Sequence, residues 1–245
     1  INTQESSVAY GHVAGEEREL SWMAKVGLIA VTFIIHVTVW HFINQYNALR
    51  PASELNDLSM AADYWISYLG WSWPVYYFAH LFVTIGGSLI IWRLPARSFV
   101  RIIVITAVMI ATAGVIQIII PARSPLPDEM NRVHAWFHRY LLNDPYVCFP
   151  SLHVALSILP ACIGIRYFKG ARVKWALCIA VVLIFISTVT LKEHYLIDSI
   201  AGGIFGLAFF EIYNLLERKD KRSGALASVP TDETAWDGSC GHHES

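Results

Sequence analysis

Pro150-Ser151-Leu152-His153 and Glu193-His194-Tyr195-Leu196-Ile197-Asp198 are two polar clusters within the stretch 148–203, and each stands at the mouth of a long apolar run. Placing a histidine or carboxylate side chain beside hydrocarbon costs free energy. An ionisable group at the edge of a membrane span therefore suggests a functional site. The rest of the chain can be interpreted as the scaffold that brings the two clusters together.

The composition of the chain is typical of a polytopic membrane protein. Of its 245 residues, 55% are hydrophobic and 15% are charged, whereas soluble domains carry about 25% charged residues. The formal net charge is −1, and no basic block interleaved with aromatic residues is present. We therefore expect a bilayer as the partner and no nucleic acid.

Six apolar runs reach or approach the roughly 20 residues that a membrane-crossing helix needs. They are 22–46, 73–94, 98–120, 150–168, 172–191 and 195–216. We predict an all-α fold, with six transmembrane helices in one bundle over residues 22–216. A tail of residues 1–21 precedes the bundle, and residues 217–245 form a disordered tail after it.

The two long connections fall on one side of the bundle. The first, 47–72, is rich in tyrosine and tryptophan, which predicts a segment lying at the membrane interface. The second, 121–149, opens with three prolines and then allows a short helix over 130–142.

The distribution of lysine and arginine predicts the orientation. Thirteen of the 18 basic residues fall on the side that holds both tails, and the others are Arg50, Arg123, Arg132, Arg139 and Lys192. The positive-inside rule therefore places both tails in the cytoplasm. Both histidine clusters then lie at the extracytoplasmic (periplasmic, extracellular or lumenal) boundary.

The two clusters have the residue types that phosphoryl transfer needs. His194 and Asp198 are four apart, so on a helix they share a face, where the carboxylate can orient the imidazole. His153 follows Ser151, a good N-cap, and a helix N-terminus offers N–H groups to an anion. A nucleophilic histidine, a histidine acid and an anion cradle suit a reaction through a phosphohistidine.

These residues carry a family resemblance. Phe149-Pro150-Ser151-Leu152-His153 resembles the P-S-x-H motif of the type 2 phosphatidic acid phosphatase superfamily, and the run from Ser187 to Asp198 resembles its last motif, S-R-x5-H-x3-D. The resemblance implies a six-helix fold. It also implies His194 as the phosphorylated nucleophile, His153 as acid to the leaving group and Asp198 as the partner of His194.

The departures from the motifs favour one branch of that superfamily. Thr188 stands where the last motif has arginine, Ile116 stands where the first motif has lysine, and Arg123 is followed by Ser124 rather than proline. A phosphodiester head group carries one negative charge and needs fewer cations than a phosphate monoester. The pattern thus resembles the inositol phosphorylceramide and sphingomyelin synthases, which move a phospho-head-group between lipids.

We therefore expect a lipid phosphotransferase with a phospholipid substrate and a lipid alcohol as acceptor. Its phosphate contacts are predicted to be Arg123, Ser151 and Lys192, and we expect no metal and no cofactor. Two alternatives stay open. One is a lipid phosphate or polyprenyl diphosphate phosphatase, in which water is the acceptor, and the other is a non-catalytic lipid-binding or transport protein.

Some residues near the clusters are expected to have no chemical role. His134 and His138 have the spacing of metal ligands, but flanking arginines favour a solvated helix face. Cys148 is expected to be a neighbour of the site without chemistry. Three glycines of the last span are expected to allow close helix packing rather than ligand binding: Gly202, Gly203 and Gly206.

Overall fold

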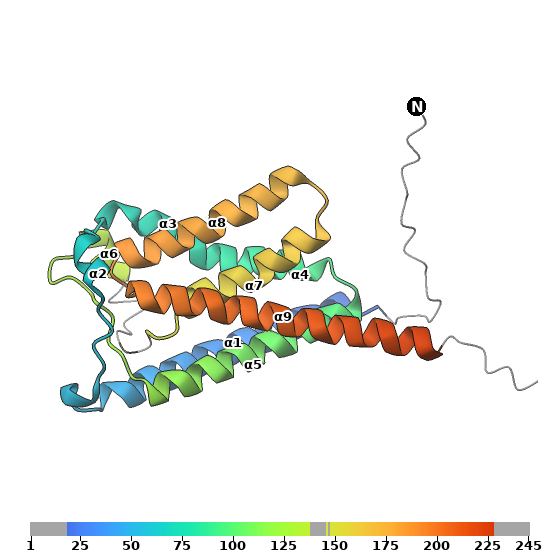
Figure 1. Ribbon diagram of the computed structural model, residues 1–245, viewed down its shortest axis with the longest axis horizontal. Coiled ribbons are helices and arrows are strands. Elements are labelled where there is room, and N and C mark those ends of the chain that lie inside the picture. The colour runs from blue at the N-terminus through green and yellow to red at the C-terminus, as the bar shows by residue number, and fades with distance from the viewer. Residues whose placement is uncertain (1–18, 138–145, 147, 228–245) are drawn as a thin grey trace, which may run out of the picture.

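The computed structural model describes residues 19–137, 146 and 148–227. These residues form helices and no strand (Figure 1), apart from one isolated bridge between Asn56 and Ala122. The prediction of an all-helical chain is therefore confirmed for the described residues.

Four of the described helices are long and apolar enough to cross a membrane. They are α1 (Trp22–Ala48), α5 (Ala96–Ile119), α8 (Ala171–Thr190) and α9 (Leu196–Ala227). Each coincides with one of the six predicted spans. Their length and composition support the expected integral membrane protein.

The other two predicted spans are helical but differ from a simple crossing helix. The second consists of α3 (Trp73–Leu81), a π-helical turn η3 (Phe82–Gly86) and α4 (Gly87–Trp92). The fourth is α7 (Leu152–Tyr167), an apolar helix of 16 residues, which is shorter than the usual span. The count of six spans therefore remains a prediction for these two segments.

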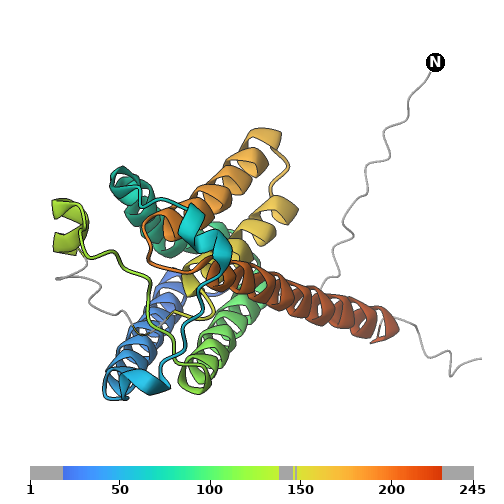
Figure 2. The ribbon, with the colours of Figure 1, turned by 60° about the vertical axis from the view of Figure 1, so that its left-hand side comes forward.

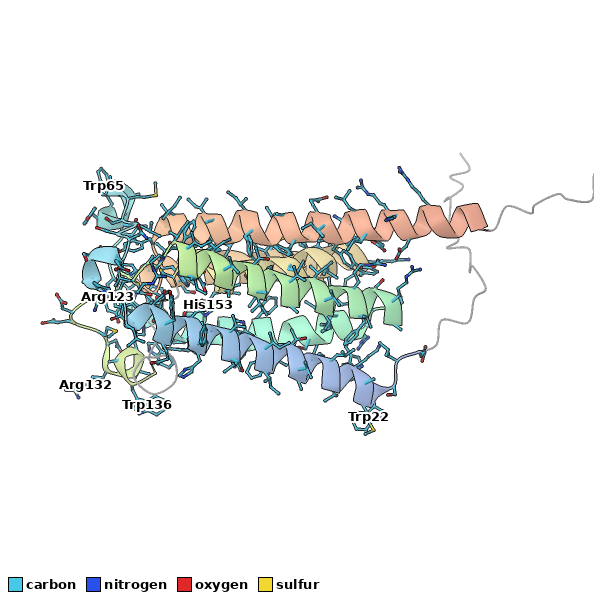
Figure 3. The ribbon with its side chains drawn as sticks, turned by 90° about the horizontal axis from the view of Figure 1, so that it is seen from below. Trp22, Trp65, Arg123, Arg132, Trp136 and His153 are labelled. Carbon is cyan, nitrogen blue, oxygen red and sulfur yellow. The ribbon has the colours of Figure 1, made fainter. Side chains whose placement is uncertain are left out.

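The helices pack around α7, which contacts α3, α4, α5, α8 and α9, while α1 lies along α5 (Figures 1 and 2). Apolar side chains of α5, α7 and α9 build the core, among them Phe99, Met109, Leu159, Ile163 and Tyr213. Figure 3 shows His153 and Arg123 at one end of the bundle, which we call the site end, and Trp22 at the opposite end, the tail end.

The connections at the site end carry short helices. Residues 49–72 hold η1 (Ala52–Glu54), α2 (Ala61–Trp65) and η2 (Gly70–Ser72). Trp65 is 88% exposed and points outward in Figure 3, in line with the predicted interfacial segment. The later connection holds α6 (Arg132–Phe137), and the remainder of the predicted 130–142 helix lies outside the described residues.

The last helix is longer than its predicted span. Instead of stopping at residue 216, α9 continues to Ala227, and the residues after it lie outside the described part of the chain. Ion pairs hold this polar extension on its neighbours: Asp220 pairs with Arg101 of α5, and Glu217 pairs with Arg166 of α7 at 2.6 Å. Tertiary contacts therefore extend a helix that composition alone ends early.

Two glycines let α7 and α9 approach closely. A Cβ atom added to Gly202 would lie 2.3 Å from the carbonyl oxygen of Ser151, and one added to Gly206 would lie 2.8 Å from that of Ala155. The expected packing role fits both positions. Gly203 differs, because its nearest neighbour would be the Ile158 Cδ1 atom at an ordinary 3.7 Å.

We predict that Gly202→Ala destabilises the protein, because a methyl group there collides with backbone that cannot rotate away. A loss of about 2–3 kcal/mol in the free energy of unfolding corresponds to a fall of roughly 4–10 °C in unfolding midpoint. Thermal unfolding in detergent measures it. Gly203→Ala is the matched control and should shift the midpoint little. Equal midpoints for the two variants would contradict the packing account.

Candidate active site at the site end

The local backbone places the two histidine clusters against each other. Ser151 caps the start of α7, and its N–H donates to the carbonyl oxygen of Asp198 at 3.0 Å. The end of α8 turns sharply: the N–H groups of Glu193 and His194 both donate to the Thr188 carbonyl. Lys192 in this turn has φ 61°, a left-handed conformation uncommon for a residue other than glycine.

The imidazole rings of His153 and His194 are in contact. Nδ1 of His153 lies 3.1 Å from Nε2 of His194, and the ring centroids are 5.4 Å apart. His194 is 4% exposed. The sequence predicted that the two rings come together, and in the described structure they form a hydrogen-bonded pair, which we call the histidine dyad.

Asp198 lies on the other side of His194 and is fully buried. Its Oδ2 atom is 3.7 Å from His194 Nδ1, an ion-pair distance that is longer than a hydrogen bond. The same Oδ2 accepts from the Tyr195 N–H at 2.9 Å and from the Cys148 thiol at 2.6 Å, while Oδ1 has no hydrogen-bond partner. The carboxylate thus faces His194 but is held chiefly by neutral donors.

Cys148 is a neighbour of this pair, as expected, and that it has no chemical role stays a prediction. Its sulfur lies 2.6 Å from Asp198 Oδ2 and 3.5 Å from His194 Nδ1. Burial, and then the negative charge of Asp198, raise the pKa of the Cys148 thiol well above its ordinary value. The thiol is therefore protonated at neutral pH and donates to the carboxylate.

Cys148, His194 and Asp198 also offer three possible metal-ligand atoms within 4.8 Å of one another. These three atoms are fewer than the four ligands of a structural Zn²⁺ site, and Asp198 Oδ2 already accepts from the Cys148 thiol at 2.6 Å and from the Tyr195 N–H at 2.9 Å. The arrangement therefore fits an oriented carboxylate better than a metal centre.

A second buried cluster lies beside the dyad. His134 of α6 is fully buried; its Nε2 lies 2.7 Å from Glu193 Oε1, and its Nδ1 lies 3.0 Å from the Tyr68 hydroxyl. The expectation of a solvated helix face is therefore wrong for His134, because α6 folds onto the turn that carries His194. His138 lies outside the described residues.

Tyr76 of α3 is another site residue that the sequence did not reveal. Its hydroxyl lies 3.5 Å from His153 Nε2, and the two ring centroids are 5.3 Å apart. The side chain is 1% exposed. An aromatic residue within an apolar run gives no signal of such a contact, because the partner is 77 residues away in the chain.

The three predicted phosphate contacts lie in different surroundings. Ser151 is fully buried beside Asp198, and its Oγ has no hydrogen-bond partner. The Lys192 ammonium donates to the carbonyl oxygen of Asp63 at 2.7 Å. Arg123 is exposed at the site end (Figure 3). The structure thus brings Ser151 to the dyad, holds Lys192 against the first connection and leaves Arg123 at the surface.

An elongated apolar cavity of about 650 Å³ reaches the dyad. His153, His194 and Leu152 line its end, and the remainder lies between α1, α4, α5 and α7. The imidazoles therefore face a space of the size and character that suits a largely apolar ligand.

A comparison with protein-family models matches residues 49–212, about two thirds of the chain, to the family described as the PAP2 superfamily. Searches of curated proteins and of solved structures returned no match. The matched residues include His153, His194 and Asp198, so the family comparison and the local geometry concern the same part of the chain.

We predict that His134→Ala destabilises the site end, because the buried Glu193 carboxylate loses a charge-assisted partner. The expected cost is about 1.5–3 kcal/mol, or an unfolding midpoint lower by roughly 4–10 °C. Arg132→Ala, at an exposed position of the same helix, is the control and should change the midpoint little. Indistinguishable midpoints for the two variants would show that the His134–Glu193 pair does not anchor α6.

The raised pKa of Cys148 predicts a pH-dependent contribution to stability. The folded state holds the thiol proton more tightly than the unfolded state, whose cysteines ionise near about 8.5. The stabilisation is therefore complete below that pH and is lost as pH rises above it. The wild-type unfolding midpoint should exceed that of Cys148→Ala at pH 7, and the gap should narrow by pH 10. A difference in midpoint that stays constant from pH 7 to pH 10 would contradict the raised pKa of the Cys148 thiol.

Proposed function

The chain belongs to the PAP2 superfamily, whose members are phosphatases and phosphotransferases. On this premise we propose that the protein is an integral membrane phosphotransferase. It moves a phospho-head-group from a phospholipid to a lipid alcohol through a phosphohistidine at His194. The observation that carries the proposal is the 3.1 Å contact between His153 Nδ1 and His194 Nε2.

In the first step, His194 Nε2 attacks phosphorus, a P–N bond forms and the bond from phosphorus to the leaving oxygen breaks. His153 gives its proton to that oxygen. The two nitrogens lie 3.1 Å apart, so a phosphoryl group that enters between them is within reach of both. Asp198, on the Nδ1 side of His194, orients the ring and stabilises its positive charge.

In the second step, the hydroxyl of the acceptor loses its proton to His153 and attacks the phosphohistidine. The new P–O bond replaces the P–N bond, and His194 regains its free nitrogen. Tyr76, whose hydroxyl lies 3.5 Å from His153 Nε2, is suited to hold the His153 ring in place through both steps. At the end of the cycle His153 again carries the proton with which the first step began.

The surroundings of the dyad favour a singly charged phosphodiester over a doubly charged phosphate. The arginine position of the last motif is Thr188, which is buried and shares a hydrogen bond with Ser199. The Lys192 ammonium is bound to a backbone carbonyl. The described contacts around the dyad are therefore made mostly by neutral donors, and we expect these donors to stabilise one negative charge on the phosphoryl oxygens more readily than two.

The membrane arrangement that we propose has six spans, including the broken α3–α4 segment and α7. The tail end faces the cytoplasm, and the dyad lies at the extracytoplasmic boundary. The excess of lysine and arginine on the tail side supports this orientation. A lipid head group then reaches the dyad from the membrane surface while its chains stay in the apolar layer.

We predict head-group exchange when the purified protein is incubated with isotope-labelled phospholipids and either ceramide or diacylglycerol. Mass spectrometry of the lipids should detect the label on the second lipid, with little free phosphate or head-group phosphate released. His194→Gln should lower the rate by more than about 1,000-fold, because it removes the nucleophile. His41→Gln, an exposed histidine of α1, is the control and should keep full activity.

The same experiment separates the alternatives. Release of inorganic phosphate from phosphatidic acid or a polyprenyl diphosphate, without transfer, would identify a phosphatase. Lipid binding with no product, unchanged in His194→Gln, would identify a non-catalytic protein. Either result would contradict the proposed transferase.

A further inference from the structure

The apolar cavity below the dyad runs through most of the height of the bundle. On α1 its wall extends from Val26 to Trp40, and on α5 from Ile102 to Gln117. At 1.5 Å per residue each wall is about 21–23 Å long. One leaflet contributes about 15 Å of hydrocarbon. The cavity is therefore deep enough to hold a chain that passes the middle of the bilayer.

Contacts at both ends hold α1 in place. At the site end the Asn47 side chain donates to the Gln117 carbonyl of α5 at 3.0 Å. At the tail end Lys25 donates to the Trp92 carbonyl at the end of α4 at 3.0 Å. Between these ends α1 and α4 face each other across the cavity, and the two hydrogen bonds tie α1 to α5 at one end and to α4 at the other.

The α1 side of the cavity is open to the surroundings. Val26, Phe33 and Val37 line the cavity and yet are 46%, 51% and 40% exposed. On the opposite wall Ile85 lies in the π-helical turn η3, a feature frequent at functional sites. A lipid in the bilayer can therefore enter from the side, between α1 and α4, without leaving the apolar layer.

We propose that this cavity binds one hydrocarbon chain of the lipid substrate, held extended below the histidine dyad, and that its depth limits the chain length accepted. The inference rests on the proposed function, because the phosphorus must lie at the dyad. The occupant follows from continuity: the cavity begins at the two imidazoles, and the phosphoryl group and chain of a lipid are covalently joined.

The physical origin of the selectivity is steric. A chain that moves from the bilayer into the cavity is out of water in both places, so it gains little hydrophobic free energy. A chain longer than the cavity must bend against the packed side chains at its deep end. The enzyme should therefore tolerate short chains and reject chains that are too long.

A shortened cavity tests this proposal. Ala30→Trp and Val26→Trp each place a large side chain on the α1 wall of the cavity. Position 30 lies one helical turn, about 6 Å, closer to the site end than position 26. Both positions are exposed enough to accept a larger side chain. Val31→Trp is the control, because Val31 is 53% exposed on α1 and is not part of the cavity lining. The substrates are phospholipids with one head group and saturated chains of graded length.

We expect Ala30→Trp to lower kcat/KM at least 10-fold for long chains and to leave the shortest chains unchanged. Val26→Trp should do the same only for the longest chains, and Val31→Trp should follow the wild-type profile. If wild type transfers the head group but all three variants keep the wild-type chain-length profile, the cavity is not the chain site.

A binding readout keeps the two proposals distinguishable when no transfer is seen. A phospholipid carrying a photoreactive diazirine at the chain end should label the deep wall around Ile102 and Ile103, and Ala30→Trp but not Val31→Trp should remove that label. This result without turnover would support the chain site and contradict the transferase. Equal labelling of the deep wall in both variants would overturn the chain site itself.

Discussion

The start of α7 rests directly on the first turns of α9, and the site depends on this contact. The Ser151 N–H donates to the Asp198 carbonyl, and Gly202 leaves room for the Ser151 carbonyl where any side chain would collide. His153 projects from the first turn of α7, and His194 lies two residues before the start of α9. The contact between the backbones of α7 and α9 therefore brings the two imidazoles close to each other.

The site is built largely from neutral hydrogen-bond donors. A thiol and a backbone amide satisfy Oδ2 of Asp198, and a tyrosine hydroxyl lies against His153. Glu193 is paired with the buried His134 rather than with a surface cation. Such an arrangement keeps the imidazoles in position without concentrating positive charge, and the proposed preference for a phosphodiester over a phosphate monoester rests on this feature.

The sequence could predict the features that rest on local pattern. Apolar runs predicted the helices, and the polar clusters at 150–153 and 193–198 predicted that His153, His194 and Asp198 lie close together. The shared helix face expected for His194 and Asp198 is wrong, because α9 begins at Leu196 and His194 lies in the turn before it. Long-range contacts were beyond such reasoning. His134 lies beside the dyad because α6 packs on the turn that carries Glu193, and no spacing rule links these two residues, which are 59 positions apart. The π-helical turn in the second span likewise has no signature in hydropathy.

The most direct test of the central claim is the position of phosphorus in a cryo-electron microscopy map of the protein with a non-cleavable phosphonate analogue of a phospholipid. The account predicts phosphorus within about 3–3.5 Å of His194 Nε2, with the oxygen of the leaving group in hydrogen-bond reach of His153. Phosphorus bound at the Lys192 turn or at Arg123, with the two imidazoles still in contact with each other, would contradict it.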